Sequence, residues 1–111
     1  MSAAPYHYHN ELASGRWLGL SLCEQMGNIG SEVHRAVMWR DRSAPTFEQA
    51  ISHALELMDL TIQDARWRGR LKEIVLAREC LRDAMSRGEK YAVSLEDLDE
   101  YFLQFAIAAR L

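Results

Sequence analysis

This sequence of 111 residues is poor in the residue types that build special frameworks. Its 2 cysteines, Cys23 and Cys80, are too few and too far apart for a disulfide framework or a Cys-x-x-Cys metal site, so both are predicted to be free thiols. With only 2 prolines and 6 glycines, it is neither a collagen-like chain nor a low-complexity linker. No apolar run approaches the length of about 18 residues that a membrane-spanning helix needs. The formal net charge of -3 excludes a chain that is basic throughout and wraps nucleic acid.

The remaining composition is that of an ordinary soluble globular domain. Apolar residues make up 49% of the chain and charged residues 26%, and the length predicts a single domain over residues 1–111. Residues 1–10 have neither the basic nor the apolar part of a signal peptide and are expected to form a loose arm, followed by a packed strap at residues 11–20. Free thiols without a targeting segment predict a cytoplasmic protein that makes no membrane contact.

Four segments carry apolar residues at the three- and four-residue spacing of an α-helix. Ser21 with Glu24, and Thr46 with Gln49, have the spacing of a capping box, and carboxylates fill the first turn after Ser94. The connections between the segments are short, which favours antiparallel neighbours. We therefore predict an all-α fold, an up-down-up-down antiparallel four-helix bundle with helices at about residues 21–42, 46–64, 66–88 and 94–110.

The aromatic residues are expected to close the two ends of this bundle. In the up-down order, Trp17, Trp67 and the region of Phe105 meet at one end, and Trp39 and Tyr91 lie at the other. Tryptophan suits such positions because it buries a large apolar surface while its N–H can still find a partner.

No arrangement of catalytic or metal-binding residues can be found in the sequence. It contains no G-x-S-x-G, no H-E-x-x-H and no glycine-rich phosphate loop, and His53 and Glu56 stand in the reverse order of a bundle E-x-x-H motif, on the polar side of the second helix. We interpret His34 and His53 as surface or boundary residues, and Gly27 and Gly30 as places where a neighbouring helix packs closely. The sequence predicts no enzyme, no metal site and no cofactor.

Several apolar or small residues fall away from the predicted core faces. On the first helix they form a stripe of Cys23, Gly27, His34 and Met38. Cys23 and His34 are too far apart for one metal ion, so we interpret the stripe as a face for self-association, as a dimer or higher oligomer, or for another protein. The later helices add four more off-core positions: Leu76, Cys80, Leu103 and Ile107.

The charge is unevenly distributed. Residues 66–90 carry eight basic and four acidic side chains, a net +4 within an acidic chain. Arginine forks match phosphate groups, so this segment is a candidate nucleic-acid contact. The alternative is a solvated surface on which the arginines pair with neighbouring acids. The candidate contact residues are Arg66, Arg68, Arg70, Arg78 and Arg82.

Two stretches, residues 28–36 (NIGSEVHRA) and 54–61 (ALELMDLT), resemble segments of a small, uncharacterised prokaryotic all-helical family over about residues 17–110. The layout is also loosely similar to the four-helix bundles encoded in 23S rRNA intervening sequences. That resemblance implies a bundle that assembles into rings, with basic surfaces in some members, and it implies no activity and no residue roles.

These observations together predict a non-enzymatic, self-associating helical bundle that serves as an interaction or accessory module. The alternative is an accessory protein that binds nucleic acid through its basic third helix.

Overall fold

The computed structural model describes residues 15–86 and 90–111, and all the secondary structure in these residues is helical. The all-α prediction is therefore confirmed. The predicted loose arm at residues 1–10, the first part of the strap and the expected helix end at Arg87 and Gly88 lie outside the described residues. The described elements are, in chain order, η2 (Trp17–Gly19), α2 (Leu22–Trp39), α3 (Ala44–Gln63), η3 (Ala65–Arg70), α4 (Leu71–Ser86) and α5 (Leu95–Ala109).

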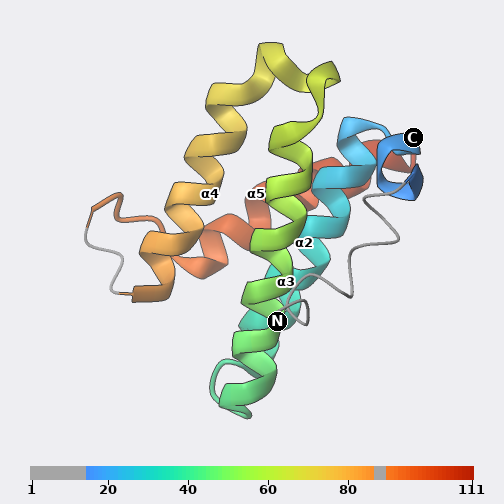
Figure 1. The fold of residues 1–111 in the computed structure, drawn as a ribbon. Helices are drawn as coiled ribbons and strands as arrows, with labels where there is room; N and C mark the ends of the chain where they lie inside the picture. Colours follow the sequence, from blue (N-terminus) through green and yellow to red (C-terminus); the bar gives the residue numbers. More distant parts are fainter. Residues whose placement is uncertain (1–14, 87–89) are drawn as a thin grey trace, which may run out of the picture.

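Helix α2 is the centre of the packing. It makes the most extensive contacts of the described helices, with α3 and with α5, whereas α4 contacts α3 and α5 more sparsely. Figure 1 shows α5 crossing behind α3, while the contacts of Gly27 with Ala106 and of Gly30 with Phe102 keep it alongside α2. No helix in the described residues is long and apolar enough to cross a membrane.

The helix starts follow from local capping. Ser21 and Glu24 form the predicted capping box, in which the Ser21 hydroxyl accepts from the Glu24 N–H and the Glu24 carboxylate accepts from the Ser21 N–H. Ser94 and Asp97 form a second box at the start of α5. The predicted cap at Thr46 is wrong, because Ser43 caps α3 instead and accepts from the Thr46 N–H.

The connections correct three predicted boundaries. The second helix begins at Ala44 rather than at residue 46, because Pro45 fits the first turn of α3, where no backbone N–H is required. The third helix does not begin near residue 66, because residues 65–70 form the tighter turns of η3 and Trp67 has non-helical backbone angles. The regular α-helix starts only at Leu71. The first helix likewise ends at Trp39 rather than near residue 42, because the chain turns there to enter α3.

The core is closed at one end as predicted but not at the other. Trp17 is fully buried, and Trp67 and Phe105 are half-buried against the same core. Trp39 is 37% exposed, with the Arg42 guanidinium over its ring, so it does not close the far end. Tyr91 is half-buried there.

Three of the four additional off-core residues are exposed as predicted. Leu76 is 51% exposed, and Leu103 and Ile107 are each 54% exposed. The prediction for Cys80 is wrong, since this residue lies in the core at 9% exposure. Cys80 follows the buried Ala77 by three residues, which turns it towards α5, and a small apolar hollow between α4 and α5 brings it near Leu98.

Candidate functional site

Two glycines let α5 pack directly on α2. A Cβ on Gly30 would lie 2.6 Å from the Cβ of Phe102, and one on Gly27 would lie 3.1 Å from the Cα of Ala106. Each glycine in a helix costs about 1 kcal/mol relative to alanine, and here the close packing around the buried Phe102 offsets that cost. The predicted close approach of a neighbouring helix is confirmed.

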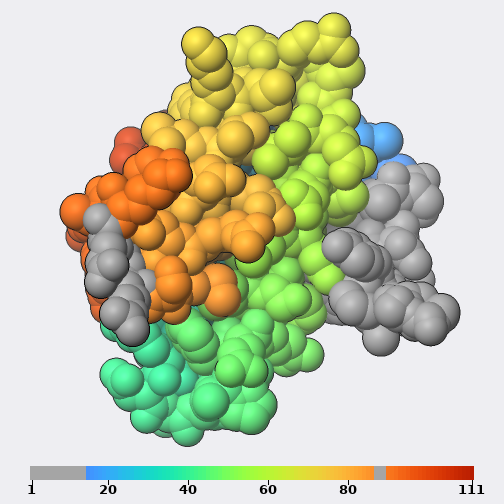
Figure 2. Space-filling view, turned by 60° about the vertical axis from the view of Figure 1, so that its left-hand side comes forward, coloured from blue at the N-terminus to red at the C-terminus, as the bar shows by residue number. Residues whose placement is uncertain are grey.

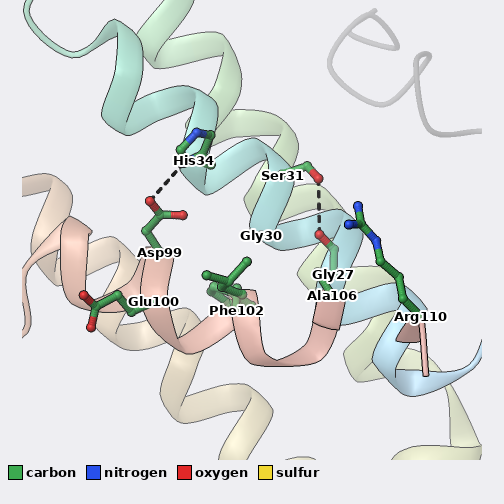
Figure 3. Close-up of a pocket in the computed structure, with 10 residues that line it drawn as sticks. Gly27, Gly30, Ser31, His34, Asp99, Glu100, Phe102, Ala106 and Arg110 are labelled. Atoms are coloured by element: carbon green, nitrogen blue, oxygen red, sulfur yellow. Dashed lines mark hydrogen bonds and ion pairs between the residues drawn. The ribbon is translucent and has the colours of Figure 1, made fainter. Parts of the chain in front are cut away.

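Beside this contact, α2 and α5 form an open groove of about 380 Å³ (Figure 3). The α2 side is made of small residues and one histidine: Gly27, Gly30, Ser31 and His34. The Ser31 hydroxyl donates to the Gly27 carbonyl, so it is directed back onto its own helix. The α5 side consists of Asp99, Glu100, Phe102, Leu103, Ala106 and Arg110. We refer to this space as the α2–α5 groove.

The two ends of the α2–α5 groove carry opposite charge. At one end the Nδ1 atom of His34 lies 3.0 Å from an Asp99 carboxylate oxygen, and Glu100 is next to Asp99 in the chain. At the other end stands Arg110, directly after the last residue of α5. Figure 3 shows the acidic pair and Arg110 at opposite ends of the drawn segment.

The predicted face on the first helix is only partly assembled. Gly27 and His34 both line the α2–α5 groove, but Gly27 also contacts α5 of its own chain. Met38 is half exposed, and Cys23 is half-buried. Sequence reasoning missed the charged residues on the α5 side, although their spacing along the helix was a readable signal.

Most of the candidate nucleic-acid contacts are engaged within the chain. Arg66 pairs with Asp64 at 2.7 Å, Arg70 with Glu73 at 2.9 Å, and Arg78 with Asp59 at 2.9 Å. The other two, Arg68 and Arg82, are exposed and form no ion pair with another described residue. Three of the five candidate arginines thus take part in ion pairs within the chain.

A buried polar network, which sequence reasoning missed, joins the η2 and η3 end of the molecule. The Gln25 side chain is fully buried, and its amide donates to the Trp17 carbonyl at 3.0 Å and to Asp64 at 3.2 Å. Its own carbonyl oxygen accepts from the Trp67 indole N–H at 3.0 Å. Three side-chain hydrogen bonds therefore hold the strap, α2 and η3 together.

Asp64 is the charged member of this network. Hydrogen bonds from the Arg66 guanidinium lower the pKa of the Asp64 carboxyl from 3.8 to about 2, although burial acts in the opposite direction. The same guanidinium donates to the Leu20 carbonyl at 2.9 Å and lies 4.4 Å from the centroid of the Trp67 ring. Arg66 therefore ties Asp64, Leu20 and Trp67 together, while its side chain remains 43% exposed.

Two further acidic residues, Glu56 and Glu73, are not simply solvated at the surface. Glu56, expected on the polar side of the second helix, is buried, and burial raises the pKa of its carboxyl. Glu73 accepts a hydrogen bond from the Tyr101 hydroxyl at 2.5 Å, which lowers the pKa of the Glu73 carboxyl and ties α4 to α5. Burial also raises the pKa of the Cys80 thiol, which makes it a poor nucleophile.

Within the described parts of the chain, no three or more His, Cys, Asp or Glu side chains gather in a way that could hold a metal ion. No family model, no curated protein and no solved structure matches this chain.

Proposed function

We propose that this chain is a non-enzymatic interaction module that associates with further copies of itself. The observation that carries this proposal is the pair Leu103 and Ile107, which lie one helical turn apart on the outer side of α5 and are both more than half exposed. Each methylene removed from water contributes about 0.8 kcal/mol, so covering such a pair favours association. Leu76 on α4 adds a third exposed apolar side chain of the same kind.

The proposal includes the up-down-up-down order of an antiparallel bundle, the layout of the 23S rRNA intervening-sequence bundles that the chain resembles. Two helix pairs support it. Gly27 and Gly30 on α2 face Ala106 and Phe102 on α5, so the contacts advance along one helix as they retreat along the other. Between α2 and α3, Glu32 approaches His53. Arg35, three residues further along α2, binds Gln49, which is four residues earlier on α3. A cytoplasmic location is also part of the proposal, supported by the free thiols of Cys23 and Cys80.

Sedimentation velocity over a series of micromolar concentrations tests self-association. We expect the weight-average sedimentation coefficient to rise with protein concentration. A sedimentation coefficient that stays at the monomer value up to tens of micromolar would overturn the proposed function. Because burial of Leu103 and Ile107 is the proposed driving force, association should also strengthen in sulfate salts, which favour apolar contact.

A second candidate function is nucleic-acid binding by an accessory protein. The observation in its favour is that Arg68 and Arg82 are exposed and without an ion-pair partner among the described residues. Retention on heparin or RNA that falls steeply as salt rises would support it, since each phosphate contact releases counterions. Binding that is absent, or insensitive to salt, removes this candidate. The matched variants are Arg68→Ala with Arg82→Ala, compared with Arg42→Ala, an exposed arginine outside the candidate segment.

A further inference from the structure

The outer side of α5 carries four residues at successive spacings of three, four and three. They are Glu100, Leu103, Ile107 and Arg110, and all four are exposed. At about 100° per residue this spacing keeps them within one narrow arc of the helix. Arg110 follows the last residue of α5 but keeps helical backbone angles, so it continues the same arc. We call these four residues the α5 stripe.

The order of charges along the α5 stripe is self-complementary. Read from the start of the helix it is acidic, apolar, apolar and basic, and read from the other end it is basic, apolar, apolar and acidic. Glu100 and Arg110 are equally far from the midpoint at Phe105, and so are Leu103 and Ile107. A second copy laid antiparallel therefore matches both the apolar pair and the charges in a single register.

We propose that two copies of this chain pair through their α5 stripes, antiparallel and around a two-fold axis that passes midway between Leu103 and Ile107. This inference rests on the proposed function and names its interface. Leu103 of each copy packs on Ile107 of the other, and Glu100 of each copy pairs with Arg110 of the other. Such a closed two-fold interface uses the same patch on both subunits and contains every contact twice. A parallel arrangement would instead place Glu100 against Glu100.

The charges of the α5 stripe are available for a second copy. Among the acids of α5, Glu96 binds Arg40, Asp97 caps its own helix, and Asp99 lies against His34. By contrast, within residues 15–86 and 90–111 no ion pair involves Glu100 or Arg110. The two-fold arrangement thus joins two charges that form no ion pair with the described residues of their own chain.

The surface beside the α5 stripe leaves room for another helix. Leu103 lies at the rim of the α2–α5 groove. The facing part of α2 projects little from the helix, because it consists of the small residues Gly27, Gly30 and Ser31. Figure 3 shows Glu100 and Arg110 near opposite ends of this groove. The space of about 380 Å³ beside the rim can receive apolar side chains of the second copy without moving α2.

Charge reversal tests the register. Glu100→Arg makes both ends of the stripe basic, and Arg110→Glu makes both ends acidic, so each variant alone should self-associate at least tenfold more weakly than the wild type. An equimolar mixture of the two variants should regain association, because each then meets a partner of opposite charge. The double variant Glu100→Arg with Arg110→Glu should also associate like the wild type. Glu48→Arg, an equal change of charge at an exposed site on α3, is the matched control.

The readout is sedimentation equilibrium, with circular dichroism to confirm that each variant keeps its helical content. If the wild type associates but the single variants associate equally well, or the mixture shows no recovery, this interface is wrong and the proposed function stands through another surface. If the wild type is a strict monomer, the proposed function fails together with the interface. Recovery in the mixture, with no effect of Glu48→Arg, supports the antiparallel register.

Discussion

Two faces of α2 differ in what their polar groups contact. On the buried face, the Gln25 side chain is hydrogen-bonded to Trp17, Asp64 and Trp67 of the same chain. Along the α2–α5 groove, the helices touch through glycines, while the charged and apolar residues of the α5 stripe stay open to solvent. The first region specifies the fold, and the second presents a surface that the fold itself does not use.

The largest loss of stability is expected when the buried hydrogen-bond network around Gln25 is broken. Gln25→Met keeps the volume but removes three hydrogen bonds and leaves the Trp67 N–H and the Trp17 carbonyl without this partner. Buried groups left unpaired cost about 1–3 kcal/mol each, so we expect the free energy of unfolding to fall by about 3 kcal/mol. Urea denaturation measures it, with Gln63→Met at an exposed site of α3 as control. Equal changes in both variants would show that the network does not stabilise the fold.

The next largest effect on stability is the contribution of Asp64, which depends on pH. Because the folded-state pKa of this carboxyl is lowered from 3.8 to about 2, its contribution is fully present above the unfolded value and is lost as pH falls through about 2. The shift corresponds to at most about 2 kcal/mol at neutral pH. Asp64→Asn should therefore be less stable than wild type at pH 7 and nearly equal to it below pH 2 (roughly the folded pKa). A stability difference that is the same at both pH values contradicts this assignment.

A smaller effect is expected where the helices touch through glycine. In Gly30→Ala the new Cβ would lie 2.6 Å from the Phe102 Cβ, so α2 and α5 must separate. Overpacking costs about 1–3 kcal/mol, and the better helix propensity of alanine returns about 1 kcal/mol of it. Thermal unfolding should show Gly30→Ala to be less stable than Gly27→Ala, whose Cβ has a nearest contact of 3.1 Å. The reverse order would mean that the contact at Gly27 is the tighter one.

The smallest effect on stability belongs to the α5 stripe. Leu103→Ser with Ile107→Ser should change the free energy of unfolding by no more than about 0.5 kcal/mol, because both side chains are mostly exposed. The same change should weaken self-association clearly in sedimentation experiments. Leu76→Ser on α4, at almost equal exposure, is the control that should leave association intact. If Leu76→Ser has the larger effect on association, the interface lies on α4.

Sequence reasoning recovered what depends on neighbours in the chain. The periodicity located all four long helices, and the caps at Ser21 and Ser94 were readable because a capping box spans only four residues. The start of α3 was missed because Ser43 and Thr46 are both good caps and only the path of the chain decides between them. The start of α4 was missed for a related reason, since the turns of η3 depend on the Asp64 side chain.

What depends on distant residues could not be read. The sequence does not distinguish Gln25 from a surface glutamine, because its partners Asp64 and Trp67 are about 40 residues away, in the connection between α3 and α4. Cys80 resembled an off-core residue because its burial depends on where α5 lies. Leu103 and Ile107 were identified correctly, since exposure on the outer side of one amphipathic helix is a local property.

The central place of α2 also has a consequence for how the chain folds. Its main contacts are with α3, which follows directly, and with α5, which is synthesised only after α3 and α4. Many of its stabilising contacts are therefore far apart in sequence, and such topologies fold more slowly than helical hairpins of local contacts. During synthesis, Gly27 and Gly30 of α2 can pack only after α5 has been made. The α2–α3 hairpin is therefore expected to form first.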